Sequence, residues 1–246
     1  MNAPFADDPF RLHPENTIFP IEGLNLRVLE GEHPFYTAER ERVAENWRRE
    51  VTANPALFDG RIVFQNRLSL RDGVVEGEAY MAPYSTYLWW RRQVRPAIGF
   101  HLFGYPVPVS SDGAIIAVRM SRHTANPGQV YCAAGSLDGS DVVDGVCDVL
   151  GNMAREVREE TGLDLGRARD DGRFFASHAG RRMVVCRLFH FDETADELLA
   201  AIRRHMIEDH EQEIAGAVAI RSADPHAHPY NPTMLPLLEW FFGNRT

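Results

Sequence analysis

Three glutamates lie close together in one short segment of the sequence, at Glu156, Glu159 and Glu160, directly after Arg155. On a helix, residues four apart project from the same face, so Glu156 and Glu160 point together with Glu159 beside them. Like charges at this spacing weaken an isolated helix, a cost that a bound hard cation would offset. Mg²⁺ or Mn²⁺ suits such carboxylate oxygens and commonly bridges to substrate phosphates. The segment therefore predicts a divalent-metal site, whereas an arbitrary helix of this composition would present only a solvated acidic face.

Strand and helix patterns surround this segment and must position it. Gly162 suits the left-handed conformation that ends a helix, so we expect a helix that begins before Arg155 and stops there. Asp72 and Gly73 form a short-turn dipeptide, and residues 110–113 give a second hairpin signal. Strands on both sides of a central helix predict an α+β fold with layered α/β/α packing. Further helices are expected over residues 37–53, 196–207 and 232–242, and strands over 61–65, 74–80, 103–109, 114–119, 129–132, 182–191 and 214–220.

Residues 155–163 resemble the second half of the Nudix box, written R-E-U-x-E-E-x-G-U with U aliphatic, and every fixed position matches. The resemblance implies a Nudix-type α/β/α sandwich in which Glu156, Glu159 and Glu160 ligate the metal and Arg155 positions a carboxylate. It also implies a hydrolase acting on a phosphoanhydride bond, in which water activated by the metal attacks phosphorus. The expected products are a nucleoside monophosphate and a phosphorylated partner.

The first half of the family pattern fits less well. Cys147 falls where the family has Glu, and Asp141 falls where it has Gly. Asp148, one residue further on, could supply the missing acid as a metal ligand. Gly135 could be the loop glycine if this chain has an insertion before the helix.

Further candidate residues come from later and earlier parts of the chain. The family often takes an acid from a later loop, and Glu213 is our candidate for a catalytic acid of this kind, with Glu211 beside it. Arg119, Arg122 and Arg182 are candidate phosphate contacts, because a guanidinium group pairs bidentately with phosphate. Taken singly, each of these arginines is more often an ordinary surface residue.

The chain divides, by these patterns, into an N-terminal β-containing extension or small subdomain at residues 1–98 and a Nudix domain with a C-terminal helix at residues 99–246. Residues 54–60, with the strands and the aromatic-rich segment 84–95 that follow, resemble the N-terminal region of a UDP-sugar-hydrolysing branch of the family. A UDP-sugar is therefore the favoured substrate. ADP-ribose or coenzyme A pyrophosphatase activity is left open, as is a non-hydrolytic nucleotide-binding protein, which Cys147 makes credible.

Composition limits the partners. A net charge of −9 at pH 7 speaks against nucleic-acid binding, since such proteins usually present a basic face. Three cysteines without CxxC spacing indicate a reducing compartment rather than a disulfide scaffold. Neither a membrane-spanning apolar run nor a signal peptide is visible, so we expect a cytoplasmic protein that acts on a small nucleotide away from membranes. A homodimer is left open.

Overall fold

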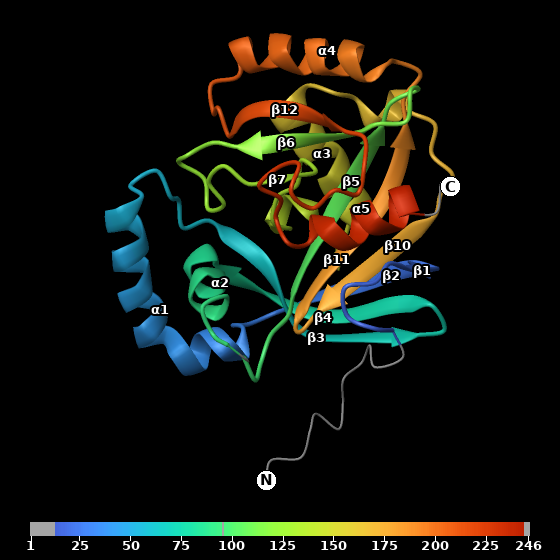
Figure 1. Ribbon diagram of the computed structural model, residues 1–246. Helices are drawn as coiled ribbons and strands as arrows, with labels where there is room; N and C mark the ends of the chain where they lie inside the picture. The colour runs from blue at the N-terminus through green and yellow to red at the C-terminus, as the bar shows by residue number, and fades with distance from the viewer. Residues whose placement is uncertain (1–12, 95, 244–246) are drawn as a thin grey trace.

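The computed structural model describes residues 13–94 and 96–243, and a seven-stranded mixed β-sheet lies at its centre (Figure 1). The strands run in the order β1-β10-β11-β5-β6-β12, and β7 pairs with β6 off this path. β5 and β11 are parallel, whereas β10–β11 and β6–β12 are antiparallel. β5 and β6 are buried along most of their length, which explains their nearly continuous apolar sequences. The seven strands are β1 (Phe19–Ile21), β5 (His101–Val109), β6 (Ile115–Met120), β7 (Val130–Tyr131), β10 (Phe174–Ala179), β11 (Arg182–His190) and β12 (Ile214–Ile220).

A second sheet has five strands in the order β3-β4-β2-β9-β8. At the β3–β4 turn, Asp72 and Gly73 have φ angles of 49° and 80°, the left-handed pair that a two-residue hairpin requires. The predicted hairpin is therefore confirmed. Leu26, Val63 and Val75 of this sheet belong to the same buried apolar cluster as the seven-stranded sheet. The five strands are β2 (Gly23–Leu29), β3 (Arg61–Arg71), β4 (Val74–Pro83), β8 (Val142–Val143) and β9 (Val146–Cys147).

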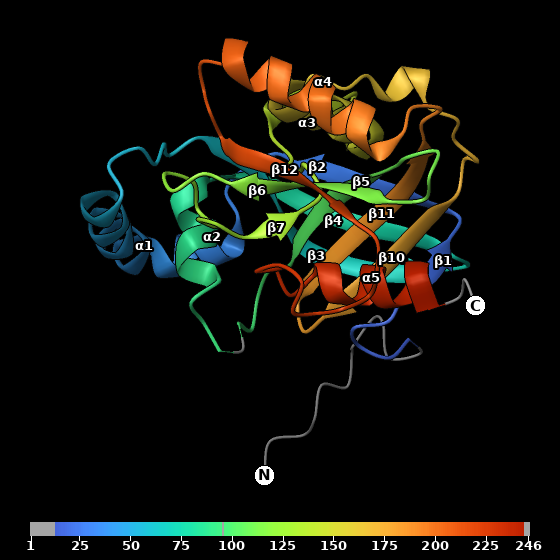
Figure 2. The ribbon, with the colours of Figure 1, turned by 45° about the horizontal axis from the view of Figure 1, so that its top comes forward.

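Helices cover both faces of the seven-stranded sheet. α3 (Val149–Thr161) and α4 (Ala195–Glu208) lie over one face, and α5 (Met234–Gly243) lies over the other (Figure 2). α1 (Pro34–Ala53) and α2 (Tyr84–Trp90) pack together at one side of the molecule (Figure 1). Short 3-10 turns span Gly139–Asp141 and Leu165–Arg167. This arrangement confirms the predicted α+β class and its α/β/α layering.

The predicted elements are present, most of them within a few residues of their expected bounds, although β3 continues to Arg71 beyond its predicted end at residue 65. The helix α2 and the strands β1, β2, β8, β9 and β10 were not predicted. β1 and β2 lie before the predicted division near residue 98, and each pairs with a strand that lies after it: β1 with β10, and β2 with β9. That division stays a prediction. Among the described residues, we find no helix that combines the length and the apolar character needed to cross a membrane.

Candidate active site

Helix α3 holds the predicted carboxylates in place because local residues fix both of its ends. Asp148 is the N-cap, and its carboxylate accepts a hydrogen bond from the Gly151 amide at 2.8 Å. Gly162 ends the helix with φ of 70°, which confirms the predicted end. Met153 is fully buried on the side that packs against β5. The opposite, polar side of the helix therefore faces the loop of residues 134–141.

Arg155 lies at the centre of an acidic cluster. Its Nη2 lies 2.9 Å from Glu156 Oε1 and 3.1 Å from Asp141 Oδ2, and its Nη1 lies 2.9 Å from Glu159 Oε2. Asp138 approaches to 3.8 Å. Burial alone would lower the pKa of Arg155, but the surrounding carboxylates, Glu156 foremost, raise it above its usual range. The charged guanidinium thus neutralises and orients several acids at once.

Glu156 and Glu160 are unusual for glutamates because they are only 7 % and 4 % exposed. Burial raises the pKa of Glu156 to about 7, although Arg155 opposes the shift. Burial, together with Glu156 and Glu213, raises the pKa of Glu160 well above its ordinary value. The Ala134 backbone hydrogen-bonds to the Glu160 carboxylate, yet Glu160 Oε2 is buried without a hydrogen-bond partner among the described residues. Such an oxygen is costly unless a cation or proton meets it.

The loop before α3 approaches Glu156 so closely at Gly135 that a side chain there would displace the Glu156 carboxylate. A Cβ on Gly135 would lie 2.3 Å from Glu156 Oε1 and 2.4 Å from Oε2. The backbone of this loop therefore forms a wall against the carboxylate, without needing a left-handed conformation at the glycine. That Gly135 is the loop glycine of the family pattern stays a prediction.

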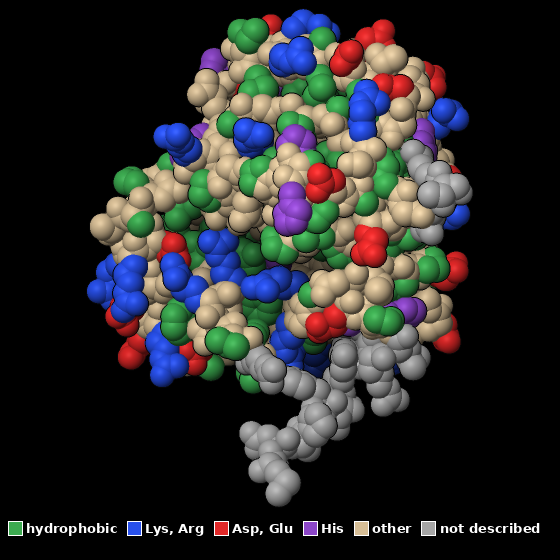
Figure 3. Space-filling view, viewed as in Figure 1, with side chains coloured by type: hydrophobic (Ala, Val, Ile, Leu, Met, Phe, Trp, Pro, Cys, Tyr) green, Lys and Arg blue, Asp and Glu red, His purple; other side chains and the backbone are tan. Residues whose placement is uncertain are grey.

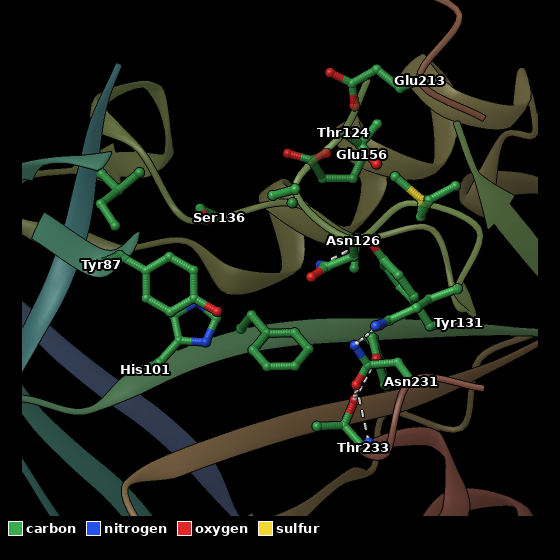
Figure 4. Close-up of a pocket in the computed structure, with 18 of the residues that line it drawn as sticks. Tyr87, His101, Thr124, Asn126, Tyr131, Ser136, Glu156, Glu213, Asn231 and Thr233 are labelled. Carbon is green, nitrogen blue, oxygen red and sulfur yellow. Dashed lines mark hydrogen bonds between the residues drawn. The ribbon is translucent and has the colours of Figure 1, made fainter. Parts of the chain in front are cut away.

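A cavity of about 940 Å³ opens beside α3. Glu156 and Glu213 lie at one end of it, and Tyr87 and His101 lie at the other (Figure 4). The cavity thus brings together side chains from α2, β5, α3 and the residue directly before β12. A molecule that spans the cavity would contact carboxylates at one end and aromatic rings at the other.

Uncharged polar side chains form one wall of the cavity. We call it the amide wall and define it as Tyr105, Gln129, Asn231 and Thr233. Asn231 Nδ2 donates to Gln129 Oε1 at 2.7 Å, and Thr233 Oγ1 donates to Asn231 Oδ1 at 2.6 Å. The Tyr105 hydroxyl lies 2.7 Å from Thr233 Oγ1. These hydrogen bonds link the four side chains at the cavity surface, where Figure 4 labels Asn231 and Thr233.

The predicted site residues fall into two groups. Besides Arg155 and the three helix glutamates, Glu213 and Arg182 line the cavity. Loss of hydration and the nearby Glu211 raise the pKa of Glu213. Arg119, Arg122 and Asp148 are exposed, do not line the cavity, and stay outside the cluster that the structure assembles.

Two acids of this cluster were missed by sequence reasoning. Asp141 is buried and accepts a hydrogen bond from Asn152 Nδ2 at 3.0 Å, in addition to its ion pair with Arg155. Asp138 and Asp141 cap each other around the short turn between them, and that three-residue acidic spacing is the only local signal. Burial raises the pKa of Cys147 to about 12, so its side chain is a neutral thiol rather than a substitute for the family's glutamate.

The donor chemistry at this end of the cavity fits Mg²⁺ or Mn²⁺. Both ions prefer the hard oxygens that Glu156, Glu159 and Glu160 supply, and the unpartnered Glu160 Oε2 is one such oxygen. Within the part of the chain that the structure describes, no three His, Cys, Asp or Glu side chains are grouped as a ready-made metal cage. Arg155 instead draws Glu156 and Glu159 into ion pairs.

Comparison with known proteins gives partial likenesses only. No family model and no curated protein matches the chain. The solved MutT protein of Methanosarcina mazei Go1 is 14 % identical, with 61 % of this chain and 95 % of that chain covered at a TM-score of 0.35. The M. smegmatis Nudix hydrolase RenU is 11 % identical, with 57 % and 80 % covered at a TM-score of 0.36. A bifunctional NMN adenylyltransferase/ADP ribose pyrophosphatase from Francisella tularensis is 19 % identical, with 44 % and 32 % covered at a TM-score of 0.29.

At these identities and TM-scores the likenesses do not bear on activity, which has to be judged from the side chains of the site.

Proposed function

We propose that this protein is a Nudix-type, divalent-metal-dependent hydrolase of a nucleoside diphosphate joined to another moiety. One observation carries the proposal. Glu160, buried and with an unpartnered Oε2, lies with Glu156 at the acidic end of a 940 Å³ cavity large enough for a nucleotide conjugate. Buried carboxylates with raised pKa values in a cleft are typical of a functional site.

Each residue of the cluster has a role in this proposal. Glu156, Glu159 and Glu160 would hold Mg²⁺ or Mn²⁺, which neutralises diphosphate oxygens and lowers the pKa of a water molecule when it is bound. Arg155 positions Glu156 and Glu159 through its ion pairs. Glu213 faces the same end of the cavity and is our candidate for the later acid that assists proton removal from the attacking water.

The favoured substrate is a UDP-sugar, and the placement of residues 54–60 supports this choice. This segment, which carries the second sequence resemblance, lines the cavity through Ala56, Leu57, Phe58 and Gly60. Asn54 Nδ2 donates to His123 O at 2.7 Å and fixes the segment against the opposite loop. The amide wall offers donors and acceptors that match sugar hydroxyl groups. The N-terminal extension would thus complete the substrate pocket.

A hydrolysis screen tests the proposal. UDP-sugars, ADP-ribose, dinucleoside polyphosphates, coenzyme A and nucleoside triphosphates are incubated with the protein and Mg²⁺ or Mn²⁺, and the products are identified. Glu160→Gln should lose activity by at least about 10²-fold, because the substitution removes one ligand charge while keeping the side-chain shape. Full activity of this variant would refute the metal site, and the absence of turnover for every compound would refute the hydrolase.

A further inference from the structure

The cavity has a basic end opposite its carboxylates. The chain contains no lysine, so the basic side chains gathered around the hollow in Figure 3 are arginines. Arg91 and Arg182 both line the cavity. Arg91 donates to the uncharged Asn126 Oδ1 at 3.5 Å and Ala125 O at 3.3 Å, and Arg182 donates to Arg91 O at 3.4 Å. Among the described residues, neither guanidinium forms an ion pair with a carboxylate.

Aromatic rings of α2 hold these two arginines in place. The Arg91 guanidinium carbon lies 5.8 Å from the Tyr87 ring centroid, and the Arg182 carbon lies 5.7 Å from the Trp90 ring centroid. A ring face attracts a cation but does not neutralise it. Two positive charges therefore line the cavity of a protein whose net charge is −9.

His101 lies between the same elements and has polar atoms without partners. Both ring nitrogens are buried and have no hydrogen-bond partner in the described chain. The ring stacks on Tyr87 with centroids 4.1 Å apart, so its orientation is fixed. Burial, together with Arg182 and Arg91, lowers the pKa of His101 to about 3, and the neutral ring carries one N–H donor and one acceptor. Unpartnered buried nitrogens on a cavity wall indicate that a ligand atom satisfies them.

We propose that Arg91, Arg182 and His101 form a subsite, the arginine arm, for a second anionic group of the substrate, a phosphate or a carboxylate remote from the scissile diphosphate. The inference rests on the proposed function, which assigns the diphosphate to the carboxylate end. Figure 4 places His101 at the other end of the cavity from Glu156 and Glu213, so one diphosphate does not account for both ends. Guanidinium donors and an imidazole N–H together match the oxygens of an anion.

Matched pairs of ligands test the arm. UDP-glucuronic acid is compared with UDP-glucose, and ADP-ribose 2′-phosphate with ADP-ribose, so that each pair differs by one carboxylate or one phosphate. Dissociation constants are measured by calorimetry on the full chain in Ca²⁺, with analysis of the ligand afterwards to confirm that it is intact. Arg182→Gln and Arg91→Gln remove the charges. Arg92→Gln is the matched control, because Arg92 is next in sequence, pairs with Glu50 at 2.8 Å and does not line the cavity.

The arm predicts that the anionic member of at least one pair binds the wild-type protein about tenfold more tightly. Which pair shows the preference distinguishes a carboxylate from a phosphate. Arg182→Gln and Arg91→Gln should abolish the preference, and Arg92→Gln should keep it. Equal affinity for the two members of both pairs would overturn the arm. So would arginine variants that weaken the binding of both members of a pair equally, or the absence of binding by any of the four ligands. Failure of the proposed hydrolase is recognised separately, because binding preference would persist without turnover in the metal-dependent screen.

Discussion

Replacement of Gly135 by alanine is the sharpest perturbation of the metal site that the structure offers. The new Cβ would lie 2.3 Å from Glu156 Oε1, about 1 Å inside the 3.4 Å at which ordinary contacts begin. Gly135 lacks a positive φ, so alanine introduces no backbone strain, and the flexible end of Glu156 moves instead. A misplacement of about 1 Å in a catalytic group costs on the order of 10²-fold in rate. We therefore expect kcat/KM of Gly135→Ala to fall by about 10²-fold while stability changes by less than about 1 kcal/mol.

Gly139→Ala is the matched control for this substitution. Gly139 lines the same cavity, has no positive φ, and its added Cβ would meet only Met81 Cε at 3.8 Å. The metal-dependent hydrolysis of the best substrate from the screen is measured for both variants, together with urea unfolding. Full activity of Gly135→Ala would refute the placement of Glu156 in the reaction. Equal losses in the two variants would show that the loop tolerates no side chain anywhere, whatever the position of Glu156.

Three further predictions concern neighbouring features. Arg155→Lys keeps one charge but loses the planar fork that reaches Asp141, Glu156 and Glu159, so kcat/KM should fall at least about tenfold with the fold retained by circular dichroism; unchanged kinetics would refute its positioning role. Asp148→Asn should keep full activity and Asp148→Ala should lose about 1 kcal/mol of unfolding free energy, because Asp148 acts as a helix cap; loss of activity in Asp148→Asn would restore it as a metal ligand. Burial lowers the pKa of His33 from 6.5 in the unfolded chain to about 4 in the folded protein. Between these two values the unfolded chain binds the proton and the folded protein does not, so the free energy of unfolding decreases as the pH falls from about 6.5 to 4. At about 1.4 kcal/mol per pH unit, urea unfolding of the wild type should lose about 3 kcal/mol more than His33→Gln over that interval, and equal losses would refute the shift.

The chemistry of α3 could be predicted from the sequence because all of it is local. Arg155, Glu156, Glu159 and Glu160 need only helical spacing to gather, and Gly162 marks the end of that helix. The β3–β4 hairpin was predictable for the same reason, since two adjacent residues determine its turn.

Features that depend on tertiary contacts could not be predicted in this way. Asp141 joins the cluster only because the β8–β9 hairpin returns the chain to α3. In the sequence, Asp141 stands where the family pattern has glycine, so the pattern gave no sign that its carboxylate belongs to the site. β10 buries Ser177 and His178 and lacks a clean alternation of apolar residues, so pairing with β11 is what stabilises it as a strand. The arginine arm is assembled from Arg91 directly after α2, His101 of β5 and Arg182 of β11, and its two arginines are 91 residues apart in the chain. Charge alone could not distinguish Arg182 from Arg119 or Arg122.

Direct metal binding tests the central claim, that the buried glutamates of α3 form a divalent-cation site. Mn²⁺ is titrated into the purified protein, and free Mn²⁺ is followed by electron paramagnetic resonance. We predict saturable binding at submillimolar Mn²⁺ by the wild type, at least tenfold weaker binding by Glu160→Gln, and unchanged binding by Asp148→Asn. Equal affinity of wild type and Glu160→Gln, or no binding by the wild type at millimolar Mn²⁺, would contradict the claim.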